Sequence, residues 1–343
     1  MATTTHSSPL SLKRTIHPVG QGAFYSEQFF NKEIETPLFT AVYDCGGQIA
    51  CLKAEIDKIS DVDILFISHF HDDHIKGLPF LIPKKNPKKI VFPKISPCRF
   101  LVDFVWNVIH DLKSMSGAKL MLKFLPILSN GDGQTIDDMV YIPVMGKRAF
   151  SILPHSEKWE YISFYDENVN DSTDSTVFSK LTSILNLPAD LDKSYQLKDF
   201  YEDIASALKK NPETVKVIKT DIYEVNYPQG HNSYSMPVLS HKCDDKSCEM
   251  NCLYTGDIKA DASTINIVSE YTPKFLQMPH HGSYENHDVR MYAHHPIAFA
   301  SVGTKNKFHH PGILVLNDIC NLCSEVHFVT EHTCSCFSRE ELI

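Results

Sequence analysis

Four metal-ligand side chains follow a short apolar segment in the first third of the chain. The apolar run at 64–67 is followed by Ser68-His69-Phe70-His71-Asp72-Asp73-His74, an H-x-H-x-D-H pattern. A short apolar run that ends in polar residues is typical of a buried strand. On extended backbone His69 and His71 point to the same side, so both can bind one ion, and Asp73 and His74 suit a second. Imidazole and carboxylate ligands favour zinc, with manganese or iron as alternatives.

The composition is that of a globular protein. Of the 343 residues, 43% are hydrophobic and 22% are charged, and the length suits one large or two ordinary domains. No apolar stretch approaches the roughly 20 residues that span a bilayer, and the polar N-terminus lacks an apolar signal core. We therefore expect a cytoplasmic protein with no membrane association. The net charge of −9 argues against loose electrostatic adhesion to DNA.

Hydrophobic periodicity predicts strands in both halves of the chain and helices between them. We expect 1–14 to be a flexible tail and 15–343 to form one domain, in which 156–226 is a helical insertion or cap. The expected strands are 14–19, 40–43, 64–67, 138–144, 148–153, 234–240, 251–254, 275–278, 297–302 and 326–329, and the expected helices are 51–59, 97–115, 175–187 and 197–210. This order predicts two sheets packed face to face, with helices outside.

Further motifs flank the histidine-rich segment, and together they resemble the metallo-β-lactamase superfamily. They are Val19-Gly20-Gln21-Gly22, Tyr43-Asp44-Cys45-Gly46-Gly47, Tyr254-Thr255-Gly256-Asp257, Met278-Pro279-His280-His281-Gly282-Ser283 and Ser301-Val302-Gly303 with Asn306 and His309-His310-Pro311. The series is most similar to the competence-protein branch, which includes a DNA-uptake channel, and to choline-binding phosphoesterases. The resemblance implies an α/β (α+β) fold, a four-layer αββα sandwich with a helical insertion. The channel carries its metal domain beside membrane helices, so this chain resembles a free-standing relative.

The resemblance also implies which residues hold two divalent ions, with zinc expected and manganese as the alternative. His69 and His71 would bind the first metal, Asp73 and His74 the second, and Asp257 would bridge both.

Three further assignments complete this expected site. His231 is the expected third ligand of the first metal, with His155 as the alternative. His281 is expected to complete the second, with His280 and His310 as alternatives. Asp44 is expected to orient the metal-binding histidines rather than to bind metal.

This ligand set predicts hydrolysis by a metal-bridged hydroxide. Two cations lower the pKa of a bridging water from about 16 towards 7. Asp73 and Asp257 are the expected catalytic carboxylates, and His310 or Asp72 could transfer a proton. Neither a G-x-S-x-G motif nor a P-loop is present. We expect a phosphodiesterase or nuclease that acts on a nucleotide, a phosphodiester or single-stranded nucleic acid.

Two alternative functions remain open at this point. The chain could be a metallo-hydrolase subunit that is active only with protein partners, for example in an antiviral defence assembly. It could also hydrolyse a non-phosphate bond in an ester, lactam or thioester, because related sites act on several kinds of bond.

Three other groups of residues admit a functional interpretation. Structural zinc could bind His241, Cys243, Cys248 and Cys252, or Cys320, Cys323, His332, Cys334 and Cys336. The spacings are not those of standard zinc knuckles, so we expect reduced thiols. The lysine-rich turn at 84–89 is either a solvated turn or a phosphate-steering patch near the site.

Overall fold

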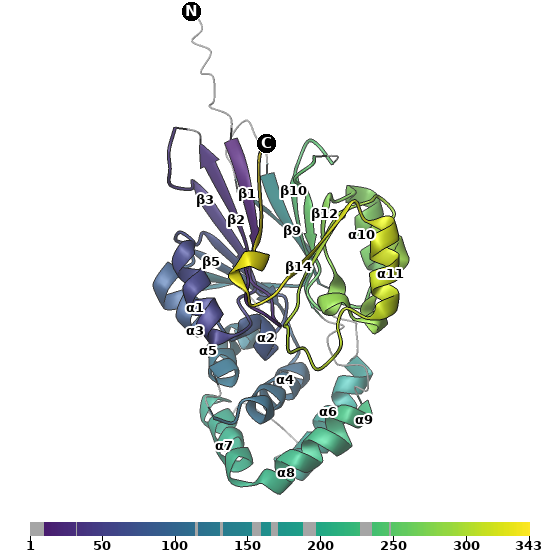
Figure 1. Cartoon of the computed structure of the whole chain (residues 1–343). Coiled ribbons are helices and arrows are strands. Elements are labelled where there is room, and N and C mark those ends of the chain that lie inside the picture. Colours follow the sequence, from purple (N-terminus) through teal and green to yellow (C-terminus); the bar gives the residue numbers. More distant parts are fainter. Residues whose placement is uncertain are drawn as a thin grey trace, which may run out of the picture.

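Two β-sheets lie face to face, and helices cover the outer face of each (Figure 1). The structure, a computed structural model, describes residues 10–31, 33–113, 116–130, 133–152, 159–165, 171–187, 197–226, 235–246 and 248–343. This arrangement confirms the predicted α/β sandwich.

The first sheet contains eight strands in the order β15-β1-β2-β3-β4-β5-β7-β6. They are β1 (Leu10–Ile16), β2 (Tyr25–Asn31), β3 (Phe39–Tyr43), β4 (Ile64–Phe66), β5 (Lys89–Pro93), β6 (Gln134–Ile136), β7 (Met139–Val144) and β15 (Phe337–Leu342). Strands β3, β4, β5 and β7 run parallel. Because Tyr43 pairs with Phe66, the segments that follow β3 and β4 begin side by side.

The second sheet contains seven strands in the order β14-β13-β12-β11-β10-β9-β8. They are β8 (Gly146–Ser151), β9 (Trp159–Tyr165), β10 (Val238–Lys242), β11 (Cys252–Tyr254), β12 (Phe275–Gln277), β13 (Ile297–Ser301) and β14 (Glu325–Val329). Strands β11 to β14 are parallel. Their carboxyl ends therefore meet at one edge, as in other parallel sheets that carry functional loops.

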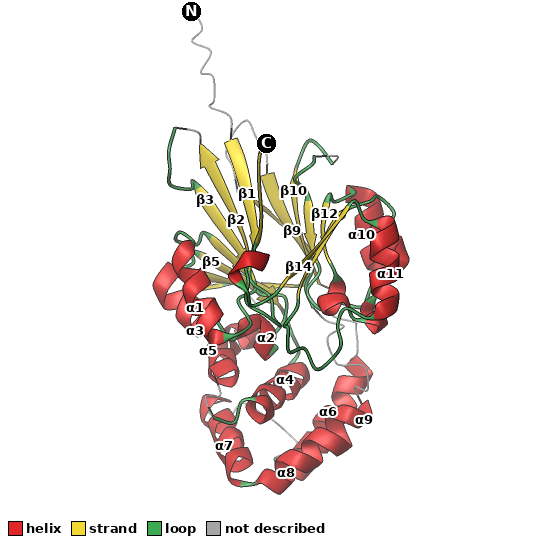
Figure 2. Cartoon of the chain, in the orientation of Figure 1, coloured by secondary structure: helices red, strands yellow, loops and turns green. Residues whose placement is uncertain are grey.

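Helices form the outer layers and a separate body at one end of the sandwich (Figures 1 and 2). The first sheet is covered by α1 (Ile49–Lys58), α3 (Leu78–Lys85) and α5 (Ser116–Asn130), and the second by α10 (Ala262–Tyr271) and α11 (Ile313–Leu322). The helical body contains α4 (Pro97–His110), α6 (Asp171–Ile184), α7 (Leu197–Lys210), α8 (Pro212–Val217), η1 (Ile218–Tyr223) and α9 (Glu224–Asn226). The short helix α2 (Asp72–Ile75) lies at the sheet edge near this body.

A buried polar network joins the two sheets. Arg14 of β1 is fully buried, and its guanidinium donates to Glu27 Oε1 of β2 at 2.5 Å. The other oxygen of Glu27 accepts from Tyr161 of β9 and Ser240 of β10, both at 2.6 Å. Arg14 also donates to the Met250 carbonyl at 2.7 Å. The Glu27 carboxylate thus accepts hydrogen bonds from both sheets, which offsets the cost of burying its charge, whereas Nη1 of Arg14 has no hydrogen-bond partner among the described residues.

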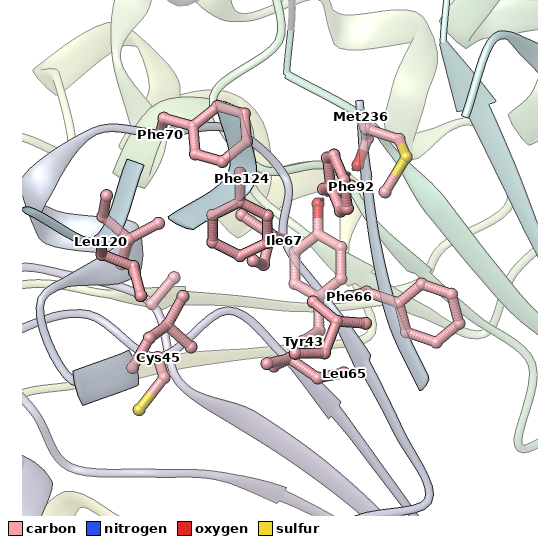
Figure 3. Close-up of a cluster of buried hydrophobic side chains, with 14 of the residues drawn as sticks. Tyr43, Cys45, Leu65, Phe66, Ile67, Phe70, Phe92, Leu120, Phe124 and Met236 are labelled. Carbon is pink, nitrogen blue, oxygen red and sulfur yellow. Dashed lines mark hydrogen bonds between the residues drawn. The ribbon is translucent and has the colours of Figure 1, made fainter. Parts of the chain in front are cut away.

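Phe70 anchors the histidine-rich segment in the core. It is fully buried, and its ring centroid lies 5.6 Å from that of Phe124 and 6.2 Å from that of Phe92 (Figure 3). Side chains alternate on extended backbone, so the anchored Phe70 directs the flanking His69 and His71 away from this aromatic cluster.

The structure corrects two predicted boundaries. Strand β1 begins at Leu10, so residues 10–14 are not part of a flexible tail. Within the predicted insertion 156–226, the segment 159–165 is β9, which pairs with both β8 and β10. The helices of that segment therefore begin only at Asp171.

Candidate metal centre

The candidate ligands gather where parallel strands of both sheets end. Asp44 follows β3, the segment from His69 to His74 follows β4, Asp257 follows β11, and His280 and His281 follow β12. The extended backbone after β4 carries His69 and His71, and α2 then turns Asp73 and His74 toward the second sheet.

Asp73, His74, Asp257 and His281 form one compact group of metal-ligand atoms. These atoms all lie within 4.8 Å of one another, and no second such group occurs among the described residues. His74 Nε2 lies 3.1 Å from Asp257 Oδ1, and His281 Nε2 lies 3.4 Å from Asp73 Oδ2. Two ligands that each lie about 2.1 Å from a tetrahedral ion are separated by about 3.4 Å. The group therefore fits a single ion.

Two ring nitrogens support the same interpretation. His74 Nε2 and His281 Nε2 are buried, and neither makes a hydrogen bond within the described part of the chain. Buried polar atoms rarely lack a partner. A metal ion held by both rings would supply that partner.

The Asp257 carboxylate faces two sets of histidines. Its Oδ1 lies near His74 and 3.9 Å from His281 Nε2. Its Oδ2 lies 3.8 Å from His69 Nε2 and 3.6 Å from His280 Nε2. Each oxygen can thus serve a different ion, which is the arrangement that a bridging carboxylate requires.

Hydrogen bonds on the far side of each ring select the nitrogen that faces the site. His74 Nδ1 donates to Asp44 Oδ2 at 2.8 Å, and His281 Nδ1 donates to the Ser301 carbonyl at 2.8 Å. Ser68 donates its hydroxyl to Asp44 at 2.7 Å, so its oxygen can accept from His69 Nδ1 at 2.9 Å. In all three rings Nε2 is left for a metal, as is usual where ligand histidines are oriented by a carboxylate or carbonyl.

Burial and neighbouring charges set the protonation of these groups. Burial, aided by the nearby His74, holds the pKa of His69 well below its usual value, so the ring is neutral and can bind metal. Burial also lowers the pKa of His74, but Asp257 and Asp44 outweigh it and raise that pKa well above the usual value. Conversely, the pKa of Asp257 is held low, because the charge of His74 overcomes the opposing effect of burial.

Two glycines allow these segments to approach closely. A Cβ on Gly46 would overlap the carbonyl oxygen of Asp73, and a Cβ on Gly256 would overlap the hydroxyl of Ser235. Gly256 also has a φ of +58°, which favours glycine. Both motif glycines therefore have a steric role beside the candidate ligands.

Replacing Asp44 by Asn should weaken metal binding without removing a ligand. Asn is nearly the same size as Asp. It has only one side-chain oxygen, so it cannot accept both the hydrogen bond from the Ser68 amide and the one from His74, which reach different oxygens of Asp44. We expect metal affinity to fall about 10- to 100-fold, the usual effect of losing such an orienting partner. Competition with a chelating dye measures this, and unchanged affinity would contradict the assigned role.

The remaining candidates for the first metal are only partly described. His71 is buried, and its ring centroid lies 4.6 Å from that of His69. His231 and His155 lie in 227–234 and 153–158, outside the described residues. His69, His71 and Asp257 Oδ2 are thus the parts of that site that the structure places.

Asp72 and His310 lie outside the compact ligand group. Asp72 pairs with Lys76 at 2.7 Å, and burial raises its carboxyl pKa. The His310 ring lies 5.4 Å from that of His280, and burial lowers its pKa to about 4. Of the three alternatives for the second metal, the structure brings His281 into the group with Asp73, His74 and Asp257.

His281→Gln and His310→Gln should separate these alternatives. We expect His281→Gln to lose the metal held with Asp73, because its Nε2 is one of four clustered ligand atoms. We expect His310→Gln to keep the full metal content. Elemental analysis after dialysis gives the stoichiometry of each variant, and the assignment is wrong if only His310→Gln loses metal.

Several orienting residues were not assigned from the sequence. Ser68 and Asn286 hold ring nitrogens of the site, Asn286 by accepting from His280 Nδ1 at 3.0 Å. Trp106 of α4 stacks 5.8 Å from His71 and packs 4.9 Å from Tyr223 of η1. The helical body is therefore in contact with the candidate centre. Ser68 could have been suspected from its place in the motif, whereas no local signal points to Trp106.

Neither cysteine group forms a second metal site in the described residues, and no disulfide joins any of the ten cysteines.

The lysine-rich turn lies at the start of β5, where Lys89 pairs with Ile64. The candidate centre follows the other end of β4. Lys84 and Lys88 also pair with Asp57 and Asp63. The interpretation of this turn as a steering patch near the site is therefore wrong.

Comparisons with known proteins find one family that the histidine-rich segment resembles. Residues 34–97 match the family described as the metallo-β-lactamase superfamily. Among solved structures, the metallo-β-lactamase fold protein YhfI from Bacillus subtilis aligns at 12% identity with a TM-score of 0.47, covering 96% of this chain and 99% of that chain. No curated protein matches the sequence. No described helix has the length and apolar character needed to cross a membrane. The segment 34–97, which contains His69, His71, Asp73 and His74, is thus similar to the metallo-β-lactamase superfamily.

Proposed function

We propose that the protein is a metal-dependent phosphodiesterase with a dinuclear centre. Asp73, His74, Asp257 and His281 would hold one ion. His69 and His71, with the second oxygen of Asp257, would hold part of the other. The observation that carries the proposal is the Asp257 carboxylate, whose two oxygens face different histidines at 3.1 and 3.8 Å.

The donor set suits this chemistry. When bound, two divalent ions would lower the pKa of a water between them and offset the charge that develops on a reacting phosphate. The protein's own groups hold the ligands in place, because Asp44, Ser68 and Ser301 fix the ring orientations before an ion binds. Preorganised ligands avoid reorganisation during the reaction.

Two observations favour a phosphodiester over a lactam or thioester. The ordered motifs resemble the nuclease and phosphoesterase branch of the superfamily. The loop that carries His310, whose ring lies 5.4 Å from that of His280, also contains the exposed Lys305 and Lys307, and these cationic groups suit an anionic substrate. Neither lysine forms an ion pair with a described residue.

The test is turnover by the purified protein after addition of zinc or manganese. Bis-p-nitrophenyl phosphate, single-stranded DNA and cyclic nucleotides cover the phosphodiesters, and a chromogenic lactam and a thioester cover the other bonds. We expect metal-dependent hydrolysis of at least one phosphodiester. Turnover of the lactam or thioester alone would show that the phosphodiester assignment is wrong.

A third outcome would favour the partner-dependent alternative. A protein that binds both metals and hydrolyses none of these substrates would indicate that it acts only within an assembly. Metal content therefore has to be measured on the same preparations.

A further inference from the structure

The loop that joins β13 to α11 carries two lysines and a highly exposed aromatic side chain beside the candidate centre. It contains Lys305, Lys307 and Phe308, and Phe308 is 71% exposed. This loop lies at the lower edge of the sheets, on the side that faces α4 (Figure 1). A single exposed apolar side chain is common on protein surfaces, so the case for Phe308 depends on the groups around it.

Hydrogen bonds hold this loop in one shape. Asn306 donates to the His310 carbonyl at 2.6 Å and accepts from the Phe308 amide at 2.8 Å. At one end Gly303 donates to Gln21 at 3.2 Å, and at the other Gly312 donates to the Gly282 carbonyl at 3.1 Å. The outward position of Phe308 is therefore set by the loop's own bonding, so little ordering entropy would be lost when it binds a ligand.

A series of rings leads from Phe308 to the candidate centre. The Phe308 ring is nearly parallel to that of His310, with centroids 6.0 Å apart and an interplanar angle of 14°. The His310 ring lies 5.4 Å from that of His280, whose Nε2 is 3.6 Å from Asp257 Oδ2. A group that stacks on Phe308 would therefore be separated from the centre only by the His310 and His280 rings.

The charges on the loop point to an anionic ligand. Lys305 and Lys307 are exposed, and neither forms an ion pair with any residue that the structure describes. By contrast, Lys84 and Lys88 of the distant turn pair with aspartates. In a chain of net charge −9, this loop carries two exposed lysines without ion pairs among the described residues and an exposed Phe, although Thr304 of the same loop donates to the Glu331 carboxylate. Cationic and aromatic side chains are the combination that binds single-stranded nucleic acid.

We propose that Phe308 is a stacking platform for the nucleobase next to the reacting phosphodiester, and that Lys305 and Lys307 contact the flanking phosphates. The inference rests on the proposed function for the chemistry at the metals. It assigns the substrate class as a nucleobase-bearing phosphodiester, in a single strand or a small nucleotide. Stacking tolerates any base, so the loop predicts little sequence preference.

Binding of a fluorescent single-stranded oligonucleotide of about 8 nucleotides tests the platform. A phosphorothioate backbone slows hydrolysis, so the metal-loaded protein can be used. We expect Phe308→Ala to weaken binding about 5- to 140-fold, the range for losing one stacked base. Phe308→Tyr should retain the affinity. Ile34→Ala is the matched control, because Ile34 is also an exposed apolar residue but lies in a different part of the sequence.

Salt dependence tests the lysines separately. Each single-strand phosphate contact contributes about 0.7 to the slope of log affinity against log salt. We expect Lys305→Gln and Lys307→Gln each to reduce that slope by about this amount. Binding by Phe308→Ala that equals the wild type would overturn the inference, and an unchanged salt slope in both lysine variants would overturn the phosphate contacts.

A small substrate separates this inference from the proposed function. Methyl p-nitrophenyl phosphate has no nucleobase, so Phe308→Ala should hydrolyse it at the wild-type rate. If no diester is hydrolysed but Phe308→Ala still weakens oligonucleotide binding, the proposed reaction is wrong and the nucleotide site stands. If diesters are hydrolysed and Phe308→Ala binds normally, only the nucleotide site is wrong. Competition by a cyclic nucleotide distinguishes a mononucleotide ligand from a strand.

Discussion

Asp257→Asn should lower metal-dependent turnover by at least about 10³-fold. The bridging position places one oxygen of Asp257 near His74 and the other near His69, so the substitution removes a charged ligand from both proposed ions. Metal ions contribute several kcal/mol of transition-state stabilisation, and each 1.36 kcal/mol is a factor of ten in rate. Asn is nearly the same size as Asp, which limits the effect on packing.

Metal content provides a second readout for the same variant. We expect Asp257→Asn to hold less metal after dialysis than the wild type, and to gain less thermal stability when zinc is added, because ligands that bind only the folded state stabilise it. Asp57→Asn is the matched control, since Asp57 is an exposed carboxylate that pairs with Lys84 at the surface. Wild-type metal content and turnover in Asp257→Asn would show that the carboxylate does not bridge.

Arg14→Met should destabilise the fold by about 3–5 kcal/mol, the usual cost of removing one partner from a buried ion pair. The Glu27 carboxylate would stay buried, without the guanidinium that donates to it at 2.5 Å. Tyr161 and Ser240 would still donate to it, but they are neutral. Urea unfolding followed by circular dichroism measures the loss. The candidate metal centre is formed by other residues, so metal stoichiometry of the folded fraction should be unchanged.

A double variant tests whether the effect comes from the uncompensated charge. Glu27→Gln removes the charge at nearly the same size and keeps one acceptor oxygen, with an NH2 donor in place of the other. We expect Arg14→Met with Glu27→Gln to be less destabilised than the sum of the two single variants, because residues in one network are not additive. Lys84→Met, which breaks an exposed pair, should change stability by less than about 1 kcal/mol. Additive effects at Arg14 and Glu27 would contradict this role of the charge.

Most strands and helices could be predicted because their apolar residues recur with the period of the element. The predicted helix 197–210 is α7, and the predicted strands near 64, 275 and 297 are β4, β12 and β13. Strand β2 was not predicted, because its Ser26, Glu27 and Gln28 are polar and yet buried. Their burial is explained only by partners such as Arg14, which lie on other strands.

The predicted start of the helical segment at residue 156 was wrong for a related reason. The segment 159–165 lies within a stretch bounded by acidic and polar residues, and nothing local shows that it pairs with β8 and β10. Strand pairing at such sequence distances is a tertiary property. Similarly, the lysine-rich turn follows the metal motif closely in sequence, but α3 and the direction of β5 carry it to the opposite edge of the sheet.

The sequence by itself determined the side-chain types of the candidate ligands and their order along the chain. The H-x-H-x-D-H segment supplies candidate metal ligands within six residues, because alternation on extended backbone and a following helical turn are local properties. Asp257 and the pair His280-His281 could be named from their motifs.

Only the tertiary structure decided how these segments meet. It turned the two oxygens of Asp257 toward different histidines, brought His281 rather than His310 to Asp73, and placed Trp106 against His71. The physical reason is that ligand distances depend on the relative position of two sheets and a helical body. That position is set by contacts between residues far apart in the chain, such as Arg14 and Glu27 with Tyr161 and Ser240.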